Sequence, residues 1–299
     1  MDRFLLDLFN QTLIHPLLDV TMVGLTTLGL ALLPVLGIAL LLTASHKRLG
    51  AAILAALIAG TAITLAFQFT VMRPRPEMVR LILSTPNFPA YPSGHAAAAF
   101  GVATVIGLTV QQWRWRIAAL AVATLIAFSR VYLGHHYPTD IFGGAILGMA
   151  VGTTCYGLIV LPQPDWRWLL WPQIALVIII SQIAYMGLLP LHLMRWPLAD
   201  KVMHFLLFGA VVFWLNLWLK GRTIRLGMWG IPIAILLPLT IALLEEGLQG
   251  FSPIRSLDAY DLISDLAGML FFWALSYKVF GSVMANSNSG VPLKHTEFK

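Results

Sequence analysis

The sequence predicts an all-α integral membrane protein with about nine transmembrane helices. Of its 299 residues, 59% are hydrophobic and only 11% are charged, and the mean hydropathy is +0.82. Soluble domains are about half apolar and a quarter charged, so these values exclude a water-soluble globule. A transmembrane helix needs roughly 20 apolar residues. Charge-free stretches occur at 20–45, 49–72, 96–112, 117–129, 141–164, 168–191, 205–219 and 226–244, and a ninth apolar stretch, 262–277, contains Asp265 near its start.

The first 18 and last 19 residues are not predicted to be transmembrane helices. Residues 1–18 mix apolar and polar side chains, which predicts an amphipathic helix lying at the membrane interface. They have neither a basic leader nor a small-residue cleavage site, so we do not expect a cleaved signal peptide. Residues 281–299 are polar and rich in Ser, Asn and Gly, which predicts a flexible tail. The single cysteine, Cys155, excludes a disulfide framework and a cysteine-based metal site.

The net charge of +6 is interpreted as a signal of orientation in the membrane and not of a nucleic-acid partner. In so apolar a chain, excess Lys and Arg are typical of basic cytoplasmic loops that face anionic lipid headgroups. Numbering the connections alternately places 11 of the 19 Lys and Arg residues on one side. We expect that side to be cytoplasmic, in a bacterial-type inner membrane, with the N-terminus outside.

Three polar segments interrupt the first five spans, at 73–76, 91–95 and 129–140. Because the spans cross the membrane in alternation, all three segments are expected on the same membrane face. On this topology that face is the periplasmic or outer one. The sequence therefore predicts that Arg, Ser, His and Asp side chains from distant parts of the chain lie together at one membrane face.

These residue types suit the transfer of a phosphoryl group. Arg75 and Arg130 offer planar, permanently charged forks for phosphate oxygens. Ser93 and the backbone N–H groups of Gly94 and His95, at a helix start, add further donors to an anion. A second histidine, His136, completes the pair that a two-step transfer needs, one nucleophile and one acid for the leaving oxygen. Asp140 lies four residues later, where its carboxylate can hold one imidazole nitrogen of His136.

In order and spacing, these motifs resemble the three signature motifs of the type 2 phosphatidic acid phosphatase family, over about residues 1–163. They read Arg75-Pro76, Pro92-Ser93-Gly94-His95, and Ser129-Arg130 followed by His136 and Asp140. The resemblance implies a helical membrane phosphatase for lipid phosphates and diphosphates that needs no metal or other cofactor. By position, it makes His136 the nucleophile that forms a phosphohistidine, Asp140 its orienting partner and His95 the general acid. The implied phosphate binders are Arg75, Ser93, Gly94 and Arg130.

The first motif departs from the family at one position. A lysine usually precedes Arg75 by seven residues, and here that position is Gln68. Glutamine donates a hydrogen bond but carries no charge, so the site loses one cation. Arg73 is the residue that we expect to compensate. The amphipathic opening of the chain is similar to that of the undecaprenyl-diphosphate phosphatase branch.

The second half carries a polar cluster of its own, at the ends of the last three spans. Its members are Asp200, Lys201, His204, Glu246, Gln249, Arg255, Asp258, Asp261 and Asp265. Over residues 166–280 the pattern resembles the VanZ-like family of small membrane proteins, which implies no secure mechanism. The cluster fits a site for a lipid headgroup or cell-wall precursor, a second active site, or an ion network that joins three helices. A divalent cation is disfavoured because a lysine and an arginine lie among the acids.

We therefore predict a phosphatase-type membrane domain at 1–163, a four-helix VanZ-like domain at 164–280 and the tail at 281–299. The predicted function is hydrolysis of undecaprenyl diphosphate or a phospholipid phosphate at the outer face, without a metal or other cofactor. Two alternatives are a phosphotransferase between lipids and a non-enzymatic lipid-phosphate binder or flippase. The expected partners are the substrate and membrane lipids, and the oligomeric state is left open.

Overall fold

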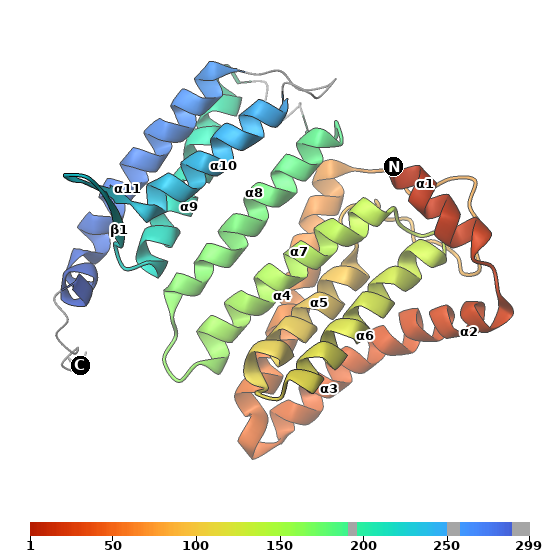
Figure 1. The fold of residues 1–299 in the computed structure, drawn as a ribbon. Helices are drawn as coiled ribbons and strands as arrows, with labels where there is room; N and C mark the ends of the chain where they lie inside the picture. Colours follow the sequence, from red (N-terminus) through yellow and green to blue (C-terminus); the bar gives the residue numbers. More distant parts are fainter. Residues whose placement is uncertain (191–195, 250–257, 289–299) are drawn as a thin grey trace. The chain divides into compact units, whose positions relative to one another are not determined.

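The computed structural model describes residues 1–190, 196–249 and 258–288, and these are mostly helical (Figure 1). The chain divides into two compact units, Met1–Pro190 and Leu191–Lys299. The first unit continues past residue 163, the predicted end of the phosphatase-type domain, because helix α8 packs against α7.

The first unit is a helical bundle that carries all three polar segments. Its opening, α1 (Asp2–Asp7) with a helical turn at Leu8–Thr12, agrees with the predicted amphipathic helix. A second helix runs from α2 through a π-helical turn into α3. The remaining bounds are α2 Pro16–Gly24, α3 Leu30–Leu42, α4 Lys47–Val71, α5 Gly94–Thr109, α6 Trp113–Tyr132, α7 Pro138–Cys155 and α8 Leu170–Tyr185.

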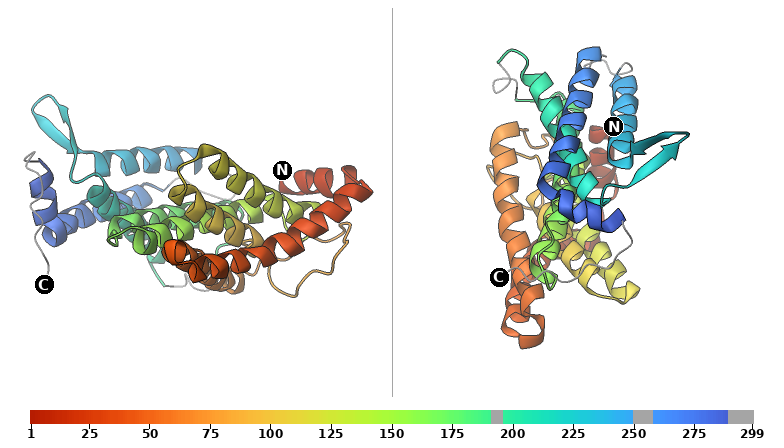
Figure 2. Two further views of the ribbon diagram at one scale, coloured as in Figure 1. Left: turned by 90° about the horizontal axis from the view of Figure 1, so that it is seen from below. Right: turned by 90° about the vertical axis from the view of Figure 1, so that its left-hand side faces the viewer.

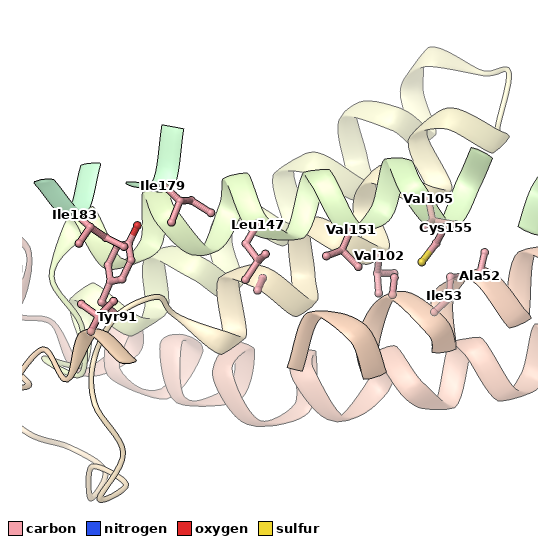
Figure 3. Packing of buried hydrophobic residues seen from close by; sticks show 13 residues of the cluster. Ala52, Ile53, Tyr91, Val102, Val105, Leu147, Val151, Cys155, Ile179 and Ile183 are labelled. Atoms are coloured by element: carbon pink, nitrogen blue, oxygen red, sulfur yellow. The ribbon is translucent and has the colours of Figure 1, made fainter. Parts of the chain in front are cut away.

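The core of the first unit lies between α4, α5, α7 and α8. Figure 3 shows it as a strip of buried side chains, with Tyr91 and Ile183 at one end and Ile53 and Cys155 at the other. Glycine brings the helices together, since a Cβ at Gly148 would collide with the carbonyl oxygen of Ala97 on α5. Close packing through small residues is the usual way in which helices associate within a membrane.

The second unit contains α9 (Ala199–Trp218), a two-stranded hairpin, α10 (Ile233–Gln249) and α11 (Ala259–Asn288). Strands β1 (Thr223–Leu226) and β2 (Trp229–Pro232) pair antiparallel and project away from the helices (Figure 2). The predicted helical span at 226–244 is thus wrong at its start. Gly227 occupies the turn with a φ of 61°, a conformation that favours glycine and suits a two-residue hairpin turn.

The predicted membrane helices are confirmed as a class but not in number. In the described part of the chain, seven helices are long and apolar enough to cross a membrane. They are Pro16–Leu42, Ala44–Val71, Trp113–Tyr132, Pro138–Val160, Trp166–Tyr185, Ala199–Trp218 and Ala259–Val279. Two of the nine predicted spans correspond to the shorter helices α5 and α10, with 16 and 17 residues. Helix α11 continues to Asn288, beyond the predicted start of the tail at 281.

Candidate active site

The turn before α5 presents hydrogen-bond donors at a helix N-terminus. Ser93 is the N-cap of α5 and is completely buried. Its backbone N–H donates to the carbonyl oxygen of Asp140 at 3.0 Å, which joins α5 to α7. The hydroxyl of Ser93 has no hydrogen-bond partner within the described residues. Because the first N–H groups of a helix also have no intrahelical acceptor, this turn can receive an anion.

Arg75 connects this region to the loop that follows α6. Its Nε donates to the carbonyl oxygen of Phe88 at 2.7 Å, and its Nη1 donates to that of His135 at 2.9 Å. The same Nη1 lies 3.3 Å from Nε2 of His136. Burial lowers the pKa of the Arg75 guanidinium, and Asp140 opposes the change, but an arginine stays charged at neutral pH. A fixed positive charge therefore lies against the outward nitrogen of His136.

Arg130 is held in the last turn of α6 by two neighbours. It is buried, and its Nη1 donates to the hydroxyl of Thr26 at 2.6 Å. Its Nη2 contacts Nδ1 of His135, whose Nε2 lies 3.0 Å from the carbonyl oxygen of Leu83. The Nε of Arg130 finds no hydrogen-bond partner among the residues that the structure describes. Thus the guanidinium is fixed at one edge and keeps a donor for a further acceptor.

His135 has a role that the sequence motifs do not reveal. Burial, followed by the charge of Arg130, lowers its pKa to about 4, so the ring is neutral at neutral pH. A neutral ring that accepts from Arg130 at Nδ1 donates from Nε2 to Leu83. The double histidine at 135–136 was the only signal in the sequence, and its first member lies outside the motif spacing.

His136 and Asp140 lie together, although His136 belongs to the turn before α7 and not to a helix shared with Asp140. Both are buried, and Nδ1 of His136 lies 3.5 Å from Oδ2 of Asp140. This distance is longer than a hydrogen bond. The same Oδ2 accepts from the backbone N–H of Tyr137 at 2.8 Å, which closes a capping box at the start of α7. Burial lowers the pKa of His136, although Asp140 opposes the change, so the imidazole is neutral at neutral pH.

His95 completes the group from the first turn of α5. Arg130 and Arg75 lie close enough for their charges to act on its ring. The structure therefore brings together the predicted nucleophile, its carboxylate, the predicted acid and two arginines. They come from four separate parts of the chain.

Gln68 and Arg73, at the motif that departs from the family pattern, make different contacts from those expected of phosphate binders. Gln68 is buried and donates to the carbonyl oxygen of Pro92 at 3.0 Å, so it supports the turn before α5. Arg73 is bound by carboxylates: its Nη1 lies 2.6 Å from Asp140 and its Nη2 lies 2.7 Å from Asp2. In this arrangement Arg73 is not a free cation for a phosphate.

The polar cluster of the second unit is an ion network between α9 and the start of α11, to which Glu246 of α10 adds a hydrogen bond. Lys201 Nζ lies 3.1 Å from Asp200, 2.5 Å from Asp258 and 2.6 Å from Asp261. His204 Nδ1 lies 3.0 Å from Asp265, and Glu246 accepts from the backbone N–H of Asp258 at 2.5 Å. Arg255 and the side chain of Gln249 lie outside the described part of the structure. Within the described ranges, no group of three or more His, Cys, Asp or Glu side chains could hold a metal ion.

Comparison with known proteins gives the family of the first unit. Residues 49–163 match the PAP2 superfamily. Phosphatidylglycerophosphatase B of Bacillus subtilis is 31% identical over 148 residues, which are 45% of this chain and 72% of that protein. The chain belongs to the PAP2 superfamily. The matched PAP2 region includes every site residue predicted in the first half, from Gln68 to Asp140.

Two further relatives match shorter stretches. Undecaprenyl-diphosphatase of Sulfolobus acidocaldarius is 40% identical over 68 residues, 23% of this chain and 32% of that protein. Undecaprenyl-diphosphatase BcrC of Bacillus subtilis is 26% identical over 98 residues, 32% of this chain and 50% of that protein. The chain thus spans half or less of the length of these two relatives. The PAP2 match ends at residue 163, before α8 and the second unit.

Proposed function

We propose that this PAP2 protein is an integral membrane phosphatase that hydrolyses a lipid phosphate or diphosphate through a phosphohistidine. The observation that carries the proposal is the surroundings of His136. Its Nε2 faces Arg75 at 3.3 Å, and its Nδ1 faces Asp140 at 3.5 Å. Arg130 and Ser93 supply further donors that have no protein partner in the described structure. A tetrahedral anion bound by these donors would have its phosphorus next to Nε2.

In the first step, Nε2 of His136 attacks phosphorus and the bond from phosphorus to the leaving oxygen breaks. His95, in its protonated form, gives a proton to that oxygen, which departs as the hydroxyl of the lipid alcohol or, from a diphosphate, of the lipid monophosphate. Asp140 stabilises the positive charge that develops on the imidazole of His136. Arg75 and Arg130 stabilise the negative charge on the transferring oxygens, which is commonly the largest contribution to such catalysis.

In the second step, a water molecule attacks the phosphorus of the phosphohistidine. His95, now neutral, takes a proton from the water, and the bond between phosphorus and Nε2 breaks. Inorganic phosphate is released, and both histidines return to their starting states. The residues balance the proton transfers between the two steps without a metal ion or other cofactor.

An apolar groove near the site fits the hydrocarbon chain of the lipid. The groove has a volume of about 510 Å³ and lies between α3, α5 and α6. Ala99 and Ile126 line it, and each is four residues from a site residue, His95 and Arg130 respectively. Residues four apart share a helix face, so the faces that carry the site continue into the groove. Its wall includes five alanines, Ala99, Ala103, Ala118, Ala119 and Ala123.

The relatives' names narrow the substrates to test. Two are undecaprenyl-diphosphatases and one is a phosphatidylglycerophosphatase, so undecaprenyl diphosphate and phosphatidylglycerophosphate are the first candidates. We place the reaction at the outer face of the inner membrane, on the loop-charge argument. The VanZ-like nature of the second half and its part in the reaction stay predictions from the sequence.

Phosphate release from these lipids by the purified full chain tests the proposal. We expect release that persists in EDTA and is reduced at least a thousandfold by His136→Ala, because the nucleophile is lost. His46→Ala is the matched control, since His46 is exposed and its Nδ1 hydrogen-bonds to the hydroxyl of the neighbouring Ser45. Transfer of phosphate to a second lipid would favour the phosphotransferase. Binding without turnover in the unmodified protein would favour the binder or flippase.

A further inference from the structure

The N-terminal helix reaches the active site through one carboxylate. Asp2, at the start of α1, accepts from Arg73 Nη2 at 2.7 Å. It also accepts from the backbone N–H and the hydroxyl of Thr139, at 3.1 Å and 2.5 Å. Thr139 directly precedes Asp140 on α7. Three segments that are distant in sequence, α1, the end of α4 and the start of α7, therefore meet at this point.

Arg73 is shared between two carboxylates at this junction. Its Nη1 lies 2.6 Å from Oδ1 of Asp140, and its Nη2 lies 2.7 Å from Oδ2 of Asp2. One guanidinium cannot neutralise two carboxylates, so the group of Asp2, Arg73 and Asp140 carries one net negative charge. Both side chains of the Arg73–Asp140 pair are largely or wholly buried, with exposed fractions of 12% and 0%. Charges in such a position are screened little by solvent and salt.

We propose that Asp2 is a positioning residue that sets how strongly Asp140 acts on His136, by holding half of the Arg73 guanidinium. The inference deepens the proposed function and rests on it. With Asp2 in place, Arg73 is divided and Asp140 keeps its effect on the imidazole. Without Asp2, Arg73 pairs with Asp140 alone, and the imidazolium character that develops at His136 during attack is stabilised less.

The other groups around His136 do not provide this negative charge. Arg75 and Arg130 face it as cations, and His95 and His135 lie near it from α5 and from its own loop. Asp140 is the carboxylate that acts on His136 within the described structure. The net charge of Asp2, Arg73 and Asp140 therefore sets the negative electrostatic potential that these groups contribute at the His136 imidazole.

Opposite shifts of the pH profile test the inference. Asp2→Asn removes a negative charge, so we expect the acid limb of kcat/KM to move to lower pH by about half a unit. We also expect kcat to fall roughly tenfold with KM within about twofold, because the loss is in the transition state. Arg73→Gln removes a positive charge and should move the same limb to higher pH. The double variant restores one net negative charge and should return the limb close to that of the unmodified protein.

Two further variants separate positioning from general damage to the helix. Asp7→Asn removes the same charge from the same helix, where Asp7 pairs with Arg3 at 3.0 Å, and should leave the pH profile unchanged. Asp2→Glu keeps the charge and should recover most of the kcat that Asp2→Asn loses. Shifts in the same direction for Asp2→Asn and Arg73→Gln, or no shift in an active Asp2→Asn protein, would overturn the inference. No phosphate release from the unmodified protein would instead refute the proposed function itself.

Discussion

Among the single residues, His135 orients the guanidinium of Arg130, which we propose as a phosphate binder. A guanidinium held at one nitrogen by a neutral imidazole and at another by Thr26 has little freedom to rotate. Its ordering is therefore completed before a ligand arrives, which lowers the entropy that binding must overcome. His135 itself makes no contact that the mechanism requires with the reacting atoms.

Replacing His135 tests this support directly. His135→Phe keeps an aromatic ring of similar shape but removes the acceptor for Arg130. We expect kcat/KM to fall about 10- to 100-fold, as is typical when a partner that orients a functional group is lost. Steady-state phosphate release is the measurement, and unchanged kcat/KM would show that Arg130 needs no such partner. His135→Asn, which can accept a hydrogen bond, should lose less.

The pH dependence follows from His136. A nucleophilic imidazole must be neutral, and burial lowers the pKa of His136 below its ordinary value of about 6.5. Protonation therefore occurs at a lower pH than for a free histidine. We expect kcat/KM to remain near its maximum as the pH falls through 6.5 and to decline only below it. An acid limb centred at or above pH 6.5, measured in the unmodified protein, would contradict the burial of this ring.

The motifs predicted which residues form the candidate site, but not how those residues contact one another. The spacing of His136 and Asp140 predicted a shared helix face, whereas His136 lies in the turn before α7, with its Nδ1 3.5 Å from Asp140. The replacement at Gln68 suggested that Arg73 supplies the missing charge. Arg73 instead pairs with Asp2, a residue 71 positions away, and no local pattern in the sequence reports that approach of α1.

Among the helices and strands, the lengths of the apolar stretches predicted where the helices occur, but were less accurate about the residues at which they begin and end. The span expected at 226–244 starts with a β-hairpin, because a charge-free stretch records hydrophobicity and not backbone conformation. Gly227 with its positive φ and the β-branched residues Thr223, Ile224 and Ile231 explain the strands. Helix α5 is shorter than a typical span and begins where the site needs a helix N-terminus.

The proposal that the groove between α3, α5 and α6 holds the lipid chain can be tested by a substitution in its wall. Ala118 lines the groove, whereas Ala121 on the same helix does not, and both are exposed. Ala118→Trp should lower kcat/KM for a long-chain lipid phosphate roughly tenfold, because the indole fills part of the space. A short-chain, water-soluble analogue should be hydrolysed as before. Ala121→Trp is the control, and equal effects of both variants on the long-chain substrate would exclude the groove as the chain site.

At the scale of the whole molecule, the chain joins a PAP2 unit to a second helical unit with its own ion network. The network satisfies Lys201 with three carboxylates, so the interpretation as helix-joining salt bridges accounts for it. The end of the phosphatase motifs predicted a domain boundary at residue 163, whereas the compact first unit continues to Pro190. Helix α8 has no motif, and its membership of the first unit follows from packing, which the sequence pattern does not show.

The orientation of the molecule can be tested at the hairpin of the second unit. Lys220, Arg222 and Arg225 lie near its start, and basic connections are typical of the cytoplasmic side. A fluorescent reporter inserted at the turn of Gly227 and Met228 should therefore be active inside the cell. Met228 is 98% exposed, so an insertion there should leave the helices intact. Activity of a reporter that works only in the periplasm would reverse the topology, and with it the outer-face site.

The central claim is that His136 carries the phosphoryl group between two steps, and rapid-quench trapping tests it most directly. Purified full-length protein is mixed with a lipid diphosphate that is labelled with ³²P in its terminal phosphate, and denatured within milliseconds in alkali, where phosphohistidine survives. We predict a protein-bound label that is stable in alkali, lost in acid and mapped to His136. It should appear faster than free phosphate in the unmodified protein and be absent from His136→Ala. Phosphate release at full rate from His136→Ala, or a label on another residue, would contradict the account.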